Sequence, residues 1–195
     1  AGMGGRLDAT NMVKNVALTV ITAIGFDHSQ YLGGTLEEIA NEKFSVLRPG
    51  GRSVFSGMPQ TLEELYLEHC KRIGNTGEIL SRSVEIRGLK VSLEGNHFEI
   101  SLRSGEYLPV KTALGGTYQV ENAALALLSA QALSFRYPRM DLKTVAGGLE
   151  RTRWRGRLER VRYGDCELVL DGAHNPQGVD ALADTFETLG TASEY

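Results

Sequence analysis

Apolar positions in the first quarter of the chain predict a buried strand followed by an amphipathic helix. Residues 16–24, "VALTVITAI", are nearly all apolar and rich in β-branched side chains, which is typical of a strand covered on both faces in a parallel sheet. A helix is predicted from Thr35, because Thr35 and Glu38 form a capping box and apolar residues follow at helical spacing. Pro49 and Gly50 are expected to end this helix.

The next segments repeat the order of strand and helix, and after them the pattern predicts strands alone. "RSVFSG" predicts a second strand, and "TLEELYLEHCKRIG" predicts a second helix that is closed by Gly74. Residues 78–112 favour antiparallel strands instead, with "VSLEGNHFEISL" forming a hairpin around Gly95 and Asn96. The pattern therefore predicts an α/β fold with a mostly parallel sheet and a small antiparallel region.

The last third of the chain is predicted to be helical, then charged, then a new strand and helix. "YQVENAALALLSAQAL" indicates a strongly apolar helix, and a shorter helix is expected over residues 142–149. "RTRWRGRLERVRYG" is charged and carries two glycines, which indicates a domain junction before the strand "CELVL" and a helix over residues 177–189. One strand and one helix cannot bury a core, so we expect this last segment to be the opening of a further domain.

Composition narrows the classes of partner. The chain has 195 residues, of which 42% are hydrophobic and 23% charged, and its net charge is −3. A general nucleic-acid or membrane binder needs a cationic surface, so small molecules are the expected partners. No apolar run approaches the ~20 residues that span a bilayer. Cys70 and Cys166 fit neither a disulfide framework nor zinc spacing, and we interpret them as reduced packing residues of a cytosolic protein.

Two candidate site residues belong to the first strand and helix. His28, beside Asp27, follows the carboxyl end of the buried strand, where open α/β sheets bind ligands; the alternative is that His28 only caps the next turn. Lys43 lies on the apolar stripe of the helix that follows. Burial favours a neutral amine, which can act as a nucleophile or add carbon dioxide to give a metal-binding carbamate, unless the side chain extends past its neighbours to solvent.

A second group of candidates surrounds the predicted domain junction. Arginines alternate at positions 151, 153, 155 and 157, so in an extended segment all four would project from one face. Most of them fit a solvated linker, but Arg157 lies beside Gly156, where a close approach would let its guanidinium hold a phosphate bidentately. In "LVLDGAHNP", Asp171 and His174 follow an apolar strand and could hold ribose hydroxyls or a phosphate; Asn175 is equally explained as a helix N-cap.

Five ordered motifs carry a family resemblance that covers nearly the whole chain. "GMGGRLDATN", "TAIGFDHSQYLGGTLEEIANEK", "YQVENAALAL", "GRLE" and "LDGAHNP" are similar in order and spacing to the folylpolyglutamate synthase and dihydrofolate synthase branch of the Mur ligase superfamily. The resemblance implies a central P-loop ATPase domain and a Rossmann-like C-terminal domain. It also implies an ATP- and Mg²⁺-dependent amide ligase that adds L-glutamate to folate or to dihydropteroate through an acyl phosphate, as a cytoplasmic monomer.

Site residues follow from the same resemblance, position by position. His28 resembles a magnesium ligand, and Lys43 resembles the lysine that is carbamylated near a second metal. Asp8 and Ala9 match the segment that touches the pterin substrate. The remaining matches are to residues that contact ATP: Asn122, Arg157, Asp171 and His174. The sequence departs from the family at Phe44-Ser45, where relatives commonly carry Ala-Gly, and this bulkier pair bears on the geometry around Lys43.

The resemblance also predicts how the chain is divided. We expect residues 1–158 to be the later part of the central ATPase domain, and residues 159–195 to be the linker end and first strand and helix of the C-terminal domain. The family's phosphate loop and metal-binding glutamate precede the first motif, so the chain is expected to be an internal fragment that is inactive alone. A non-catalytic nucleotide-binding relative and another Mur-type amino-acid ligase are the alternative functions.

Overall fold

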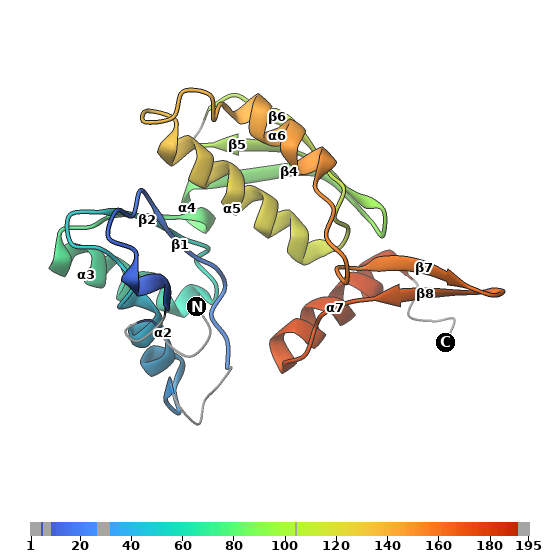
Figure 1. Ribbon diagram of the computed structural model, residues 1–195, viewed down its shortest axis with the longest axis horizontal. Coiled ribbons are helices and arrows are strands. Elements are labelled where there is room, and N and C mark those ends of the chain that lie inside the picture. Colours follow the sequence, from blue (N-terminus) through green and yellow to red (C-terminus); the bar gives the residue numbers. More distant parts are fainter. Residues whose placement is uncertain (1–4, 6–8, 27–31, 104, 191–195) are drawn as a thin grey trace.

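A parallel sheet with helices on both faces forms the first part of the fold. The computed structural model describes residues 5, 9–26, 32–103 and 105–190. Strands β1 (Thr19–Ile21), β2 (Arg52–Phe55) and β3 (Thr76–Ile79) run parallel in that order. Helices α2 (Leu36–Phe44) and α3 (Glu63–Ile73) lie on one side of the sheet, and α5 (Thr117–Leu133) lies on the other (Figure 1).

The central strand β2 shows why this sheet is buried on both faces. Its successive side chains point to opposite sides: Phe55 packs with Tyr66 of α3, while Val54 joins the cluster that α5 covers. Both side chains are fully buried. The α/β class and the double coverage are as predicted, although β1 is shorter than the apolar run over residues 16–24.

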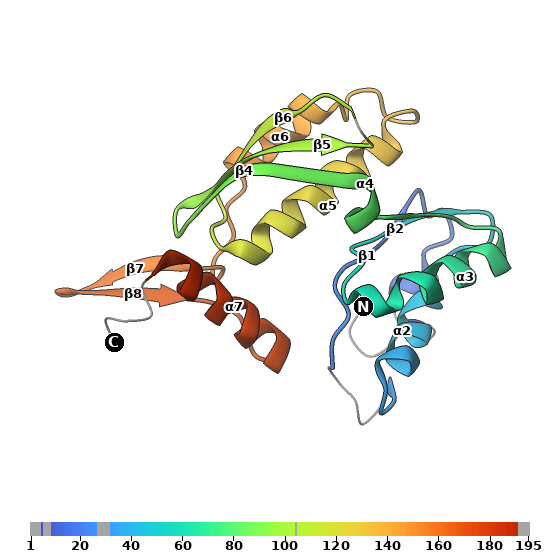
Figure 2. The same ribbon diagram turned by 180° about the vertical axis from the view of Figure 1, so that it is seen from behind.

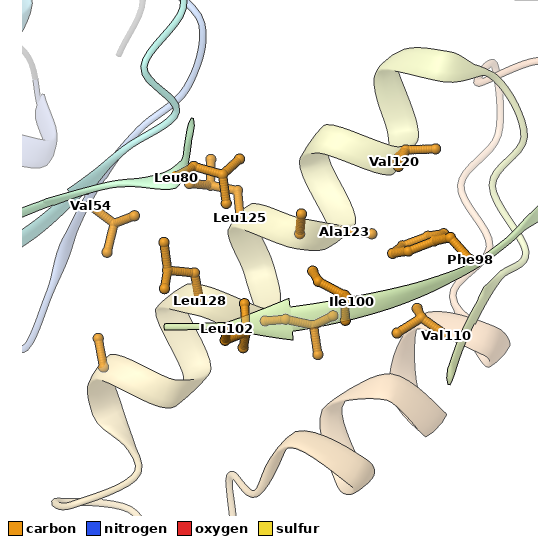
Figure 3. Close-up of a cluster of buried hydrophobic side chains, with 13 residues drawn as sticks. Val54, Leu80, Phe98, Ile100, Leu102, Val110, Val120, Ala123, Leu125 and Leu128 are labelled. Atoms are coloured by element: carbon orange, nitrogen blue, oxygen red, sulfur yellow. The ribbon is translucent and has the colours of Figure 1, made fainter. Parts of the chain in front are cut away.

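An antiparallel sheet forms the second layer. Strands β4 (Val84–Ser92), β5 (Gly95–Leu102) and β6 (Leu108–Thr112) pair in sequence order, and α4 (Leu80–Ser83) connects them to β3. Helices α5 and α6 (Leu142–Arg151) pack against this sheet, and Figure 3 shows side chains such as Phe98, Ile100 and Leu128 meeting between α5 and the strands. Helix α5 therefore has apolar residues all around, because it is buried between two sheets.

The predicted hairpin exists, but its turn lies earlier than expected. Leu93 and Glu94 form the turn, and Gly95 is already paired with Ser92 as the first residue of β5. Gly95 has φ +145°, and a Cβ at this position would stand 2.0 Å from the carbonyl oxygen of Thr112. The glycine is thus required by the close approach of β6 and by its backbone conformation rather than by the turn.

A hairpin and a helix complete the described chain. Strands β7 (Glu159–Tyr163) and β8 (Cys166–Leu170) are antiparallel partners, and α7 (Pro176–Leu189) follows them. The hairpin extends away from the other two sheets in both views (Figures 1 and 2). The prediction of a single strand in this region was wrong, because β7 pairs with β8. The interpretation of both cysteines as packing residues holds for Cys70, which is buried, and was wrong for Cys166, which is exposed.

Helix ends follow local sequence signals in most places. The Thr35–Glu38 capping box is present at α2, Gly74 closes α3 in the left-handed conformation, and Asn175 caps α7. Helix α2 ends at Phe44, however, and not at the predicted Pro49-Gly50. Short 3-10 helices, η1 (Ala9–Met12) and η2 (Gln60–Leu62), complete the order of elements. No helix of the described residues is long and apolar enough to cross a bilayer.

Candidate nucleotide-binding site

A cavity of about 780 Å³ lies where the end of β1, the start of α5 and the C-terminal segment meet. Its walls on the sheet side include Ile24, Phe26 and Met58, which give it an apolar lining. Across from them, residues 175–178 at the start of α7 close the opposite side. A concave, mostly apolar site with a few polar side chains is the usual form of a small-molecule site.

Helix α7 is fixed to α5 by a buried hydroxyl. The cap residue Gly116 offers no side chain to the first turn of α5, which leaves backbone N–H groups without a partner inside the helix. The amide of Thr117 instead donates to Oγ1 of Thr185 at 3.1 Å, and Thr185 is fully buried. The hydroxyl of Thr185 also contacts that of Thr117, at 2.9 Å. Through this contact the start of α7 is held over the cavity.

Asp171 joins three parts of the chain at the cavity wall. Its Oδ2 accepts hydrogen bonds from the Tyr118 hydroxyl at 2.7 Å and the Leu158 amide at 3.0 Å, and its Oδ1 accepts from the Ala173 amide at 2.8 Å. Burial raises the pKa of Tyr118, and the Asp171 carboxylate raises it further, so the phenol remains protonated and donates. Leu158 has φ +49°, a costly conformation that the bond to Asp171 helps to hold.

Arg157 presents its guanidinium to the same cavity. The side chain lies beside Gly172, where an added Cβ would stand 3.5 Å from Nη1 of Arg157, and no carboxylate in the described part of the chain forms an ion pair with it. The segment before it is not extended as the alternating arginines suggested. Arg151 ends α6, and Arg155 and Gly156 form a turn, so Arg157 alone of the four lines this cavity.

Asn122 is the third predicted nucleotide contact that lines the cavity. It lies in the second turn of α5, where its Nδ2 donates to Oε1 of Gln119 at 3.1 Å. The amide oxygen and the second N–H are left to pair with a ligand, and an amide can bind an adenine edge through one donor and one acceptor. Asn122, Arg157 and Asp171, which are far apart in sequence, therefore face one space.

His174 lies just outside that space. It is exposed in the loop before α7, and its Nδ1 stands 2.8 Å from the carbonyl oxygen of Gly172. A carbonyl can only accept, so Nδ1 carries the proton and Nε2 points its lone pair elsewhere. The neighbours on either side, Ala173 and Asn175, line the cavity, whereas His174 does not.

Of the candidates from the first part of the chain, the two that the structure describes, Ala9 and Lys43, do not line this cavity. Asp8 and His28 lie outside the described residues. Ala9 is exposed at the start of η1, and Lys43 is half-buried in the last turn of α2. Among the described residues there is no group of three or more His, Cys, Asp or Glu side chains that could hold a metal.

Phe44, the departure noted beside Lys43, is a core residue. Its ring is fully buried and meets the rings of Phe55 and Tyr66 edge-on, at centroid distances of 5.5 and 5.4 Å. These contacts fix the last turn of α2, and with it the backbone of Lys43.

Sequence reasoning missed Glu121, which also lines the cavity and is half-buried. Burial raises the pKa of this carboxyl group, and a hydrogen bond with Ser56 opposes the rise. In the sequence, the only clue to Glu121 was its position next to Asn122 in "YQVENAALAL". The location of its side chain depends on the packing of α5 against β2.

Comparisons with known proteins agree along almost the whole chain. The dihydrofolate synthase/folylpolyglutamate synthase of Bacillus subtilis is 36% identical over 95% of this chain, and that of Mycobacterium tuberculosis is 33% identical over 95%. The chain spans 43% and 39% of the lengths of these two relatives.

Solved structures give the same result for the fold. A folylpolyglutamate synthase complex with AMPPCP and folate superposes with a TM-score of 0.88 at 25% identity, over 96% of this chain and 46% of that one. The Mycobacterium tuberculosis folylpolyglutamate synthase in complexes with ADP and AMPPCP gives a TM-score of 0.81 at 32% identity, over 95% of this chain and 42% of that one. The model of the Mur ligase middle domain matches residues 2–130, so the chain belongs to the Mur ligase middle-domain family.

Proposed function

We propose that the full-length protein is an ATP-dependent amide ligase that adds L-glutamate to folate, to dihydropteroate, or to both. The support is the agreement of two independent observations. Relatives that are named for these activities match along 95% of the chain, and the fold brings three predicted ATP contacts into one cavity. We further propose that it works as a cytoplasmic monomer.

The proposed division of the chain is the one expected from the sequence. Residues 1–158 would belong to the central ATPase domain, and residues 159–195 to the C-terminal ligase domain. The tight links between α5 and α7, and between Tyr118 and Asp171, favour a nucleotide site that both domains share.

The cavity suits a nucleotide in its chemistry. Its apolar wall fits a base, the free amide groups of Asn122 fit a base edge, and the forked guanidinium of Arg157 fits phosphate oxygens. Asp171 already accepts three hydrogen bonds, but a carboxylate has about four acceptor sites, which leaves one for a ribose hydroxyl.

In this reaction type, ATP transfers its γ-phosphoryl group to a carboxylate, and an amine then attacks the acyl phosphate and releases phosphate. The residues around the cavity would act by positioning. Arg157 would hold phosphate oxygens, Asp171 would hold the sugar, and the start of α7 would cover the site and exclude water.

The Mg²⁺ that accompanies ATP would be held by residues that the described part of the chain does not gather. Lys43 is the described candidate, and the other, His28, lies outside the described residues. The donor set of the described residues does not by itself fit a metal centre.

The test is to purify the full-length protein and measure ATP-dependent incorporation of labelled glutamate into dihydropteroate and into reduced folate. We expect amide product and ADP in equal amounts. A matched reaction with UDP-muramyl peptides and their amino acids serves as the control for substrate class.

Two results would contradict the proposal. Product formed only with the UDP-muramyl peptides would indicate another Mur-type ligase. Nucleotide binding without any glutamate-dependent ADP release would indicate a non-catalytic nucleotide-binding relative.

A further inference from the structure

Glu121 is an acidic side chain of α5 that faces the cavity and has no part in the contacts assigned to Asn122, Arg157 and Asp171. It lies one turn into the helix, half-buried, and lines the cavity together with Ile24, Met58 and Asn122. A carboxylate is costly to place in such surroundings, and the upward shift of its pKa expresses that cost.

Ser56 is the polar neighbour of this carboxylate on the sheet side. Ser56 is buried directly after β2, where its Oγ accepts a hydrogen bond from the Met58 amide at 3.2 Å. The hydroxyl proton of Ser56 is therefore directed elsewhere. Its interaction with the Glu121 carboxylate lowers the pKa of Glu121 against the larger effect of burial, which places Ser56 beside this carboxylate.

Glu121 has no ion-pair partner among the described residues. Arg157, which lines the same cavity, makes no ion pair with it. A half-buried acceptor that lines a ligand cavity is satisfied when the ligand brings a donor.

We propose that the Glu121 carboxylate accepts a hydrogen bond from an amino group of the molecule bound in this cavity. The inference rests on the proposed function, which supplies two sources of that chemistry. One is the exocyclic amino group of the adenine base, and the other is the α-ammonium group of L-glutamate. A neutral amino group needs only a hydrogen-bond acceptor, whereas an ammonium group also needs the negative charge of the carboxylate. Substitutions that remove the charge alone, or the acceptor as well, therefore distinguish the two sources.

The experiment uses the full-length protein with Glu121→Gln and Glu121→Met. Glutamine keeps the size and an acceptor but removes the charge, whereas methionine keeps the size and removes the acceptor. Glu68, an exposed glutamate of α3, gives the matched controls Glu68→Gln and Glu68→Met. The measurements are the dissociation constants of ATP and of inosine triphosphate, which lacks the exocyclic amino group, the KM for glutamate, and the melting temperature.

Each source predicts its own pattern. If adenine is the donor, the wild type prefers ATP over inosine triphosphate, Glu121→Met lowers that preference about tenfold or more, and Glu121→Gln retains most of it. If the α-ammonium group is the donor, both variants raise the KM for glutamate by about tenfold and leave the preference for ATP unchanged. Both control variants behave as the wild type.

A purely structural role gives a different result. A Glu121→Met protein with a shifted melting temperature, but with the nucleotide preference and the glutamate KM within twofold of the wild type, overturns the inference. If Glu121→Met does not fold, equal wild-type affinity for the two nucleotides, together with an unchanged glutamate KM in Glu121→Gln, overturns it instead. Failure of the proposed function is distinct, because the wild type would then form no glutamate product.

Discussion

Replacing Asp171 by asparagine tests whether one carboxylate holds the C-terminal segment to the rest of the chain. The aspartate accepts three hydrogen bonds, from Tyr118, Leu158 and Ala173. Asparagine has the same shape, but one of its two terminal atoms is an NH₂ donor. Whichever way the amide turns, a backbone N–H that now meets an acceptor would meet a donor.

The size of the effect follows from those contacts. Hydrogen bonds to a charged group contribute about 1.5–3 kcal/mol each, and at least one is lost here while the charge assistance of the others disappears. Leu158, at φ +49°, also loses the bond that holds its strained backbone. We expect local opening to become easier by about 2 kcal/mol, which is roughly a thirtyfold rise in the opening equilibrium.

Amide hydrogen exchange followed by NMR measures this quantity residue by residue. The amides of Leu158 and Ala173 are the direct reporters because they donate to Asp171. Amides of β5 are the internal reference because that strand lies in the buried cluster between α5 and the antiparallel sheet. Asp165→Asn, at the exposed turn between β7 and β8, is the matched control. Exchange at the two reporter amides should accelerate about thirtyfold in Asp171→Asn and remain unchanged in the control.

Two outcomes would refute this reasoning. Reporter amides that exchange within threefold of the wild-type rate would show that the carboxylate is not what holds the segment. Equal acceleration in β5 would show a global loss of stability instead of a local opening.

Four further predictions test other parts of the structure. Glu63 is 2% exposed; burial alone would raise the pKa of its carboxyl group, but hydrogen bonds from Ser81 and Arg82 and the charge of Arg82 outweigh it, and the pKa is lowered. The ionised group therefore stabilises the fold fully above pH ~4.5, and this stabilisation is lost as the pH falls through the lowered pKa. Glu63→Gln should lower the free energy of unfolding in urea at pH 7 by about 1–3 kcal/mol, with a smaller difference at pH 3. Arg157→Lys should weaken ATP binding, measured by calorimetry, by ~1–3 kcal/mol without changing the melting temperature, since a lysine cannot form the forked pair; unchanged binding would return Arg157 to the solvated linker. Lys43 should carry a carbamate in the full-length protein, and carbon-13 NMR with labelled bicarbonate and magnesium should show its resonance. Lys43→Ala should remove both that resonance and most of the activity. A wild-type spectrum without the resonance would defeat the idea. Gly95→Ala should lower the free energy of unfolding by roughly 3 kcal/mol or more, because both its φ and a backbone carbonyl of β6 exclude a side chain, and a loss below 1 kcal/mol would contradict that geometry.

Local sequence signals determined much of the secondary structure. The capping box at Thr35, the left-handed Gly74 and the cap at Asn175 each depend on residues within one helical turn, so they can be read without the fold. The β-branched run before residue 24 likewise predicted a doubly covered parallel strand. Strand β7 was missed because most of its side chains are exposed and charged, and its apolar alternation is limited to Val161 and Tyr163.

The candidate site was decided by tertiary structure. The order of motifs indicated the family and the residues Asn122, Arg157 and Asp171, but their meeting in one cavity depends on the buried contact between α5 and α7 and on the turn at Gly156. Glu121 became a candidate only when the packing of α5 placed it beside Ser56. Sequence patterns report which face of an element is buried, because burial follows the local period of apolar side chains. They do not report which distant side chains share a space, because that depends on how whole elements pack against one another.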